Sequence, residues 1–230
     1  MFERPHHRQI AKLLAAFDSD FLQRAHCYFG GGTAIVLQLG EYRESVDIDF
    51  LCSSKAGYRA LRNTITTQEL GAMVRTPVRY LREVRADRDK VYTILDIDGQ
   101  PVKTEFVLEA RIRLSGTQHP ELSVPVLCRE DLYAEKLLAN ADRWADRSTM
   151  SRDIIDLAMM IDGWGPIPEQ AWAKSRTAYG AAVGKAFENA TRMLDGGDWL
   201  ASCLHRMQMA PRWAKVIRTA LQSATGPSAR

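Results

Sequence analysis

The spacing of apolar residues divides the chain into a mixed first part and a helical second part. In the first part, short or alternating apolar runs predict strands near residues 27–29, 46–50, 78–84, 91–97 and 102–108. Helical spacing there predicts helices near residues 8–23 and 58–70. Beyond Pro125, the same spacing predicts helices near residues 130–145, 152–161, 169–178, 182–194, 200–208 and 212–223. The pattern is typical of an α/β unit with a helical extension.

A run of three glycines stands at the end of the first predicted strand. Gly30, Gly31 and Gly32 lead through Thr33 into a short apolar segment, which we interpret as a buried helix. The free N–H groups at such a helix start attract phosphate. Taken alone, a glycine run is most often just a turn.

Two aspartates follow on a strand in which apolar and polar residues alternate. Because successive side chains point to opposite faces, we expect a buried face of Val46, Ile48 and Phe50 and an opposite face of Ser45, Asp47 and Asp49. Two carboxylates this close repel each other unless something positive lies between them. A pair of magnesium ions would supply that charge, because carboxylate oxygens suit hard cations. An aspartate pair alone is more often a solvated face or an isolated cation site.

A third carboxylate lies on a predicted β-hairpin. The turn at Asp98 to Pro101 separates two strand patterns, and the second places Glu105 on the same face as Lys103 and Val107. The alternative reading of this segment is a solvent-facing lysine–glutamate pair on an amphipathic strand.

In their order and separation, these features resemble the nucleotidyltransferases of the DNA polymerase β superfamily. The segments Gly31 to Ala34 and Ser45 to Phe50 are similar to the AbiEii/AbiGii toxin branch, which includes the MenT toxins. The resemblance runs from about Phe29 to Met160. It implies an α/β fold with a polymerase β-like nucleotidyltransferase core and a mixed sheet. Because the pattern becomes helical near Pro120 to Pro125, we place this core at residues 1–124 and a C-terminal helical region, which completes the active-site cleft, at residues 125–230.

The resemblance also implies roles for the residues of the core. Asp47, Asp49 and Glu105 would bind two Mg²⁺ ions and act in catalysis. The phosphates of a nucleoside triphosphate (NTP) would be bound by Gly31, Gly32, Thr33 and Ser45. In the MenT group, a serine at the place of Ser45 can carry a phosphate that silences the enzyme; the alternative is that Ser45 only forms a hydrogen bond at a strand end.

In the helical region, the segment around Lys136 resembles the Ala-x-Lys-Leu helix of the family. This implies that Lys136 contacts the triphosphate and acts in catalysis, with Asn140 and Arg143 on an adjacent nucleotide-binding stripe. The later Arg-Asp-x-x-Asp-Leu motif implies an active-site role for Asp153. Helix capping is the alternative for Asp153, and holding an arginine structurally is the alternative for Asp156.

The implied function is transfer of a nucleotide from an NTP to an RNA, in particular tRNA, by a toxin that an antitoxin protein restrains. A small-molecule nucleotidyltransferase of the antibiotic-modifying type is the enzyme alternative. A catalytically idle nucleotide-binding module is the alternative without activity. Two departures from the family pattern, a longer segment between Gly32 and Asp47 and a glutamate as the last acid, remove no charge.

Composition and charge fit a globular protein with a polyanionic partner. With 230 residues, 46% of them hydrophobic, the chain can bury a full core. Its net charge is +3, yet the residues from Trp164 onward carry nine Lys/Arg and only four Asp/Glu. A second basic series, in which a solvated face and RNA contact are equally open, consists of Arg75, Arg79, Arg82, Arg85 and Arg88.

The remaining signals concern compartment and the N-terminus. The four cysteines are scattered without metal-ligand spacing, so we expect reduced, partly buried residues in a cytoplasmic protein. No apolar run approaches the roughly 20 residues that a membrane span needs, and no signal-peptide segment is evident. His6 and His7 are expected to be solvated.

Overall fold

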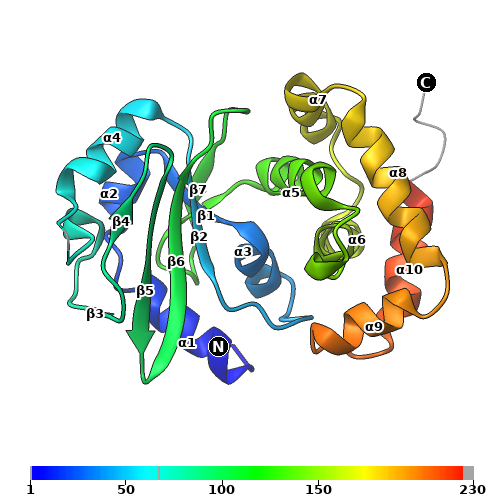
Figure 1. Ribbon diagram of the computed structural model, residues 1–230, viewed down its shortest axis with the longest axis horizontal. Coiled ribbons are helices and arrows are strands. Elements are labelled where there is room, and N and C mark those ends of the chain that lie inside the picture. Colours follow the sequence, from blue (N-terminus) through cyan, green and yellow to red (C-terminus); the bar gives the residue numbers. More distant parts are fainter. Residues whose placement is uncertain (1, 67, 225–230) are drawn as a thin grey trace. The chain divides into compact units, whose positions relative to one another are not determined.

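A mixed β-sheet forms the centre of the first of two units (Figure 1). The structure is a computed structural model that describes residues 2–66 and 68–224. The first unit comprises the chain up to Leu37 together with Ser45–Cys128. The second comprises Gln38–Glu44 and the chain from Arg129 onward. The α/β core and the carboxy-terminal helices expected from the sequence are both present.

In the described residues the sheet has eight strands, in the order β3-β5-β6-β2-β1-β8-β7, with β4 paired to β5. The strands β2 and β6 are parallel, as are β1 and β8, whereas the other pairs are antiparallel. Their bounds are β1 Cys27–Gly30, β2 Ile48–Cys52, β3 Arg79–Tyr80, β4 Arg85–Ala86, β5 Lys90–Ile97, β6 Gln100–Leu108, β7 Gly116–Gln118 and β8 Pro125–Leu127.

Aromatic side chains fill the core on one face of this sheet. The rings of Phe50 and Phe106, Cα partners on β2 and β6, stack with centroids 4.9 Å apart. Phe17 meets Phe50 edge-on at 5.2 Å. Ile48 is fully buried on the same face, but Val46 is 39% exposed. The expectation that Val46 belongs to the buried row is wrong, because β2 begins only at Ile48.

The helices of the first unit are α1 Pro5–Leu14, α2 Ser19–Arg24, α3 Gly31–Gln38 and α4 Lys55–Thr64. The expected helix at residues 8–23 is two helices, because the Asp18 side chain accepts a hydrogen bond from the Phe21 N–H and caps α2. The expected helix at residues 58–70 begins and ends earlier as α4, and residue 67 lies outside the described residues. Figure 1 shows α2 and α4 on one side of the sheet and α3 on the other.

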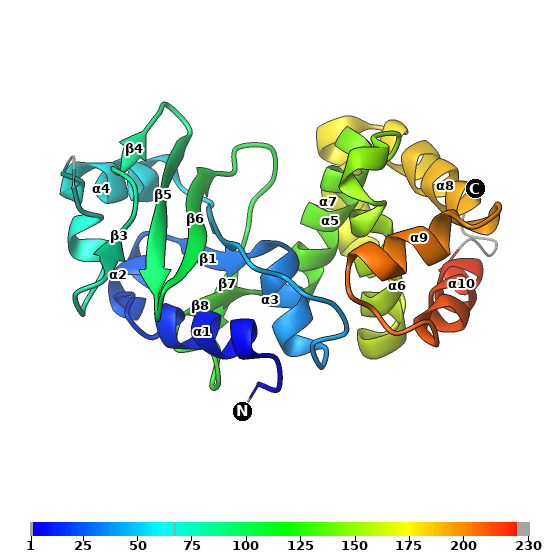
Figure 2. The same ribbon diagram turned by 60° about the horizontal axis from the view of Figure 1, so that its bottom comes forward.

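The second unit is helical in the described residues, with α5 packed against α6, α7 and α8, and α10 packed against α6 (Figure 2). None of the described helices is both long enough and apolar enough to cross a bilayer. The bounds are α5 Arg129–Arg143, α6 Arg152–Trp164, α7 Glu169–Tyr179, α8 Ala182–Asp195, α9 Trp199–Arg206 and α10 Trp213–Ala224.

Candidate active site

The glycine turn lies directly against the strand aspartate. Gly30 ends β1 and is the Cα partner of Asp49 on β2, and Gly31 then opens α3 with a φ of +66°. A Cβ on Gly31 would lie 2.6 Å from Asp49 Oδ2. Only glycine combines this backbone conformation with such a close approach. The backbone at the start of α3 and the Asp49 carboxylate therefore line one place.

Asp49 and Glu105 stand side by side on the face opposite the aromatic core. They are Cα partners on the parallel strands β2 and β6, which puts their backbones about 4.8 Å apart. Asp47 lies one residue before β2 and is half-buried. Two of the three carboxylates predicted from the sequence thus stand on neighbouring strands, and the third lies directly before β2.

Glu105 is held by two lysines. Its Oε1 lies 2.9 Å from Lys90 Nζ and its Oε2 lies 2.8 Å from Lys103 Nζ, while its side chain is only 13% exposed. Burial tends to raise the pKa of Glu105, but the hydrogen bonds from Lys103 and Lys90 outweigh it and lower the pKa. Lys103 and Glu105 do pair, but the Glu105 side chain is largely buried and not solvent-facing as in the alternative reading of the sequence. Lys90 is a partner that the sequence did not indicate.

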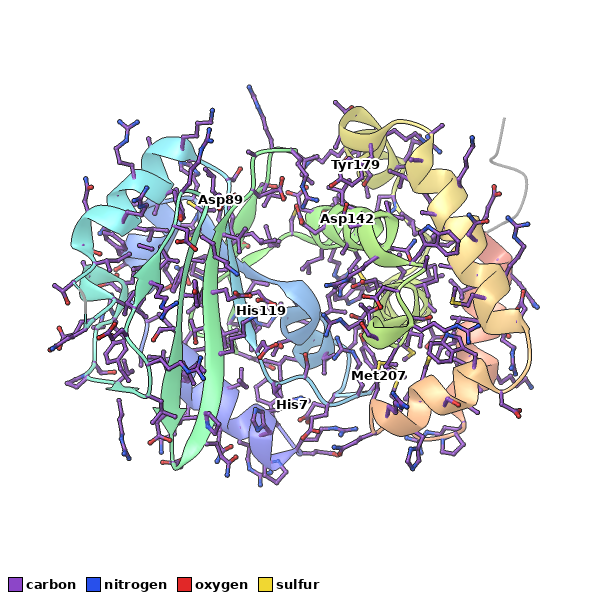
Figure 3. The ribbon with its side chains drawn as sticks, in the orientation of Figure 1. His7, Asp89, His119, Asp142, Tyr179 and Met207 are labelled. Carbon is purple, nitrogen blue, oxygen red and sulfur yellow. The ribbon has the colours of Figure 1, made fainter. Side chains whose placement is uncertain are left out.

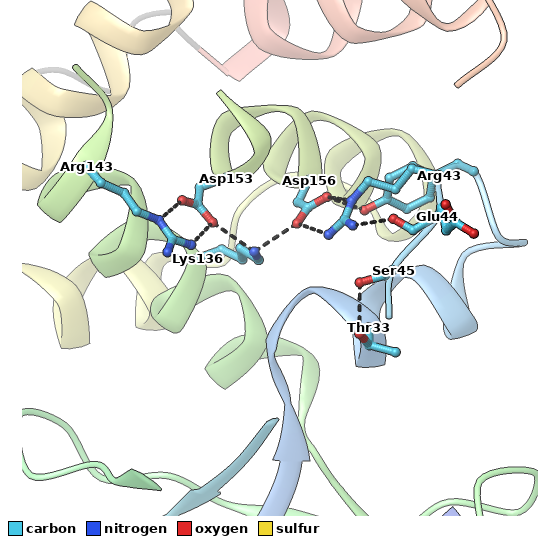
Figure 4. Close-up of polar contacts among 9 residues, drawn as sticks. Thr33, Arg43, Glu44, Ser45, Lys136, Arg143, Asp153 and Asp156 are labelled. Atoms are coloured by element: carbon cyan, nitrogen blue, oxygen red, sulfur yellow. Dashed lines mark hydrogen bonds and ion pairs between the residues drawn. The ribbon is translucent and has the colours of Figure 1, made fainter. Parts of the chain in front are cut away.

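The segment leading to Asp47 is fastened by Thr33 and His7 (Figures 3 and 4). The hydroxyl of Thr33, which is 1% exposed, donates to the Asp47 carbonyl at 2.5 Å and lies 2.8 Å from Ser45 Oγ. Because Thr33 has a single hydroxyl proton, Ser45 must donate to it. The Ser45 N–H donates to His7 Nε2 at 3.1 Å, which requires a neutral imidazole.

The expectation that His7 is solvated is wrong, because the side chain is fully buried. Pro5 starts α1 two residues earlier, and His7 then shares the inner face of this helix with Ile10, three residues further on. The sequence signal that indicates a buried His7 is its position three residues before Ile10, a spacing that puts both side chains on one face of a helix. Ser45 itself lies outside any strand.

In the second unit, Lys136 lies between two aspartates (Figure 4). Its Nζ is 2.9 Å from Asp153 Oδ1 and 2.8 Å from Asp156 Oδ2. Arg143 adds two bonds to Asp153, from Nε at 2.6 Å and from Nη2 at 2.9 Å. Asp153 on α6 therefore forms ion pairs with two cations of α5. Burial tends to raise the pKa of Asp153, but Lys136 and Arg143 outweigh it and hold the pKa well below the ordinary value.

Asp156 has an arginine partner, the alternative left open by the sequence. Arg43 donates from Nε at 2.7 Å and from Nη2 at 2.9 Å, and the Tyr42 hydroxyl donates at 2.7 Å. Burial opposes ionisation of Asp156, yet Arg43 and Lys136 lower its pKa to about 2. The sequence did not indicate Tyr42 and Arg43, because they lie between the glycine turn and Ser45, where no motif marks a site residue.

The other two predicted nucleotide-binding residues of the second unit also belong to α5. Asn140 is 1% exposed, and its Nδ2 has no hydrogen-bond partner among the described residues. Arg143 is held by Asp153 as described above. A buried amide donor without a protein partner calls for a water molecule or a ligand as its partner.

The donor set of the core suits a divalent cation, because the oxygens of Asp47, Asp49 and Glu105 are hard ligands. Among residues 2–66 and 68–224, however, no group of three or more His, Cys, Asp or Glu side chains is gathered closely enough to hold a metal ion. The two lysines on Glu105 supply the positive charge there. Within the part of the chain that the structure describes, Cys27, Cys52, Cys128 and Cys203 form no disulfide.

The fold is that of a nucleotidyltransferase. A candidate nucleotidyltransferase of known structure from H. pylori superposes with a TM-score of 0.55 at 14% identity, covering 95% of this chain and 92% of that one. JHP933 from Helicobacter pylori gives 0.51 at 14% identity, covering 97% and 93%. These likenesses show a shared fold. The nucleotidyltransferase toxin MenT4 from Mycobacterium tuberculosis matches at 15% identity over 96% and 95% of the chains, with a TM-score of 0.35.

The family model for the nucleotidyl transferase AbiEii toxin of Type IV toxin–antitoxin systems matches residues 12–227. The chain therefore belongs to the AbiEii nucleotidyltransferase toxin family. No curated protein sequence matches it.

Proposed function

We propose that this family member is a metal-dependent enzyme that transfers a nucleotide from an NTP to an RNA acceptor, in particular tRNA, and that an antitoxin protein restrains it. The observation that carries the proposal is the lateral alignment of Gly30, Asp49 and Glu105 across three adjacent strands, with the Gly31 backbone against the Asp49 carboxylate. This alignment supports the proposal, because backbone N–H groups of the kind that bind phosphate and carboxylates of the kind that bind a hard cation lie at one place. The family's description, a toxin of Type IV toxin–antitoxin systems, supports the proposal of an antitoxin partner.

In this proposal Asp47, Asp49 and Glu105 would hold Mg²⁺. Bound there, magnesium would lower the pKa of the attacking hydroxyl and stabilise the leaving pyrophosphate. The N–H groups of Gly31, Gly32 and Thr33 would bind phosphate oxygens. Thr33 and His7 keep the segment from Ser45 to Asp47 in one conformation, so that Asp47 enters the site with a defined position.

The second unit would contribute Lys136, Asn140 and Arg143 to nucleotide binding and Asp153 to catalysis. Its buried network contains three cations against two carboxylates, so it has one excess positive charge to offer an anion. The cations are Arg43, Lys136 and Arg143.

A nucleotide-transfer assay tests the proposal. Incubation with Mg²⁺, each labelled NTP in turn and total tRNA should label a tRNA-sized band, and chelation of the metal should abolish it. The isosteric variant Asp49→Asn, like Asp47→Ala, should lose this labelling, because a carboxylate ligand is removed. Asp198→Asn, an exposed aspartate in the second unit, is the matched control and should keep it.

Circular dichroism should show that all three variants are folded. Full activity in Asp49→Asn would remove the assigned site. Labelling of a small hydroxylated compound in place of RNA would move the assignment to the antibiotic-modifying type.

A further inference from the structure

A groove of about 950 Å³ opens between α4 and the β4–β5 hairpin of the first unit. Four cationic side chains line it, and the only acid among its lining residues is Asp89, labelled in Figure 3. The cations are Lys55, Arg59, Arg62 and Arg88. The groove therefore has an excess of three positive charges.

Three of these cations form a stripe along α4. Lys55, Arg59 and Arg62 are spaced by four and three residues, which places them on one face of the helix. The inner face of the same helix is fixed by Tyr58 and Leu61, which are 3% and 0% exposed. The stripe extends about 10 Å along the helix axis, which is several phosphate spacings of a nucleic-acid strand.

The groove cations have no ion-pair partners within the described residues, nor do their side chains form hydrogen bonds there. Two members of the basic series outside the groove do have such partners: Arg75 pairs with Asp18 and Asp20, and Arg79 pairs with Asp96. Like charges gathered in one groove repel one another, so an anion with several charges is the ligand that this surface fits.

We propose that this groove binds the sugar-phosphate backbone of the RNA acceptor, an inference that rests on the proposed function. The aromatic ring of Tyr58 is buried, and its hydroxyl donates to the Asp87 carbonyl, so the groove offers no open ring for base stacking. Contacts here are therefore to the backbone and position the RNA without reading its sequence.

The groove lies within reach of the candidate active site in the same unit. Leu108, the last residue of β6, lines the groove three residues beyond Glu105, or about 10 Å along the strand. Because an odd separation puts the two side chains on opposite faces, RNA held in the groove reaches the acids by passing over the carboxyl ends of β2 and β6. The body of the acceptor would be held on one face and its reacting end on the other.

The test compares Arg59→Ala/Arg62→Ala with Lys185→Ala/Arg192→Ala, which removes two exposed cations from α8. Binding of fluorescein-labelled total tRNA is followed by anisotropy across a salt series. Losing two phosphate contacts should reduce the slope of log K against log salt by about 1.4 to 1.8. Affinity at low salt should fall on the order of tenfold, and the control should stay near wild type.

In the transfer assay, the KM for tRNA should rise by the same factor while kcat at saturating tRNA stays unchanged. If the groove variant binds tRNA with the affinity and salt slope of the control, the groove assignment is overturned, even when wild type labels tRNA. If wild type labels no RNA but the groove variant alone loses tRNA binding, the groove stands and the proposed transfer reaction fails.

Discussion

Replacing Arg43 by methionine should destabilise the helical unit by about 3 kcal/mol. Arg43 makes two of the four bonds to the buried Asp156 carboxylate, and the other two come from Lys136 and Tyr42. Breaking a buried ion pair typically costs about 3–5 kcal/mol, because a charge stays buried without compensation. Lys136 remains in place in the variant, which puts the expected cost at the lower end.

Tryptophan fluorescence in urea measures this loss selectively. All five tryptophans of the chain lie in the helical unit, at Trp144, Trp164, Trp172, Trp199 and Trp213. The matched control is Arg192→Met, an exposed arginine on α8. It should change the free energy of unfolding by less than about 0.5 kcal/mol.

The pH dependence gives a second arm. The folded-state pKa of Asp156 is about 2, against 3.8 for an ordinary aspartate, so its ionisation contributes about 2 kcal/mol of stability above pH 4. That contribution is lost as the pH falls through about 2. In Arg43→Met the pKa of Asp156 moves back up. The difference in free energy of unfolding between wild type and variant should therefore narrow as the pH falls below about 5. A variant as stable as Arg192→Met, or a gap independent of pH, would refute the role of the buried pair.

Substitutions at three positions of the core give further tests. Gly31→Ala places a methyl group 2.6 Å from a carboxylate oxygen at a positive φ, so urea unfolding should show that the free energy of unfolding falls by about 1–3 kcal/mol. Its control is Gly184→Ala, in open space on α8, which should raise the free energy of unfolding by about 0.5–1 kcal/mol. Thr33→Val keeps the shape but frees the Asp47 carbonyl, so the kcat of transfer should fall in a protein that stays folded; an unchanged kcat would contradict its positioning role. Ser45→Ala should retain transfer activity and Ser45→Asp should lose it through repulsion by neighbouring carboxylates, and equal activities would exclude a phosphate switch.

The six long helices beyond residue 128 could be predicted to within three residues at each end. Their signals are local: amphipathic spacing along each helix, with breaks at Gly163 to Pro168, Gly196-Gly197 and Pro211. The hairpin of β5 and β6 was predictable for the same reason, since its turn and both strand patterns lie within one short segment. Helices and hairpins whose ends are marked by nearby residues can be predicted without information on distant parts of the chain.

The short strands β7 and β8 were missed because their pairing is not local. Val126 on β8 pairs with Phe29 on β1, far away along the chain, and nothing in three residues distinguishes such a strand from a loop. The same strand shows why the first unit continues to Cys128 rather than ending at residue 124. The start of β2 was displaced for a related reason: the Asp47 carbonyl is taken by the Thr33 hydroxyl, and that bond is invisible in a pattern of alternating residues.

For the candidate site, residue types indicate the chemistry but do not show how each charge is matched. The motif predicts that Lys136 binds phosphate. In the structure its Nζ lies 2.9 Å and 2.8 Å from two buried aspartate oxygens, a pairing that depends on helices α5 and α6 together. Glu105 was read as a metal ligand, yet two lysines hold it. In both places opposite charges already stabilise the buried group, so a substrate or ion must compete with an existing partner. At each place, the affinity for a substrate or ion would then depend on the cost of separating the existing lysine–carboxylate pairs as much as on the new contacts.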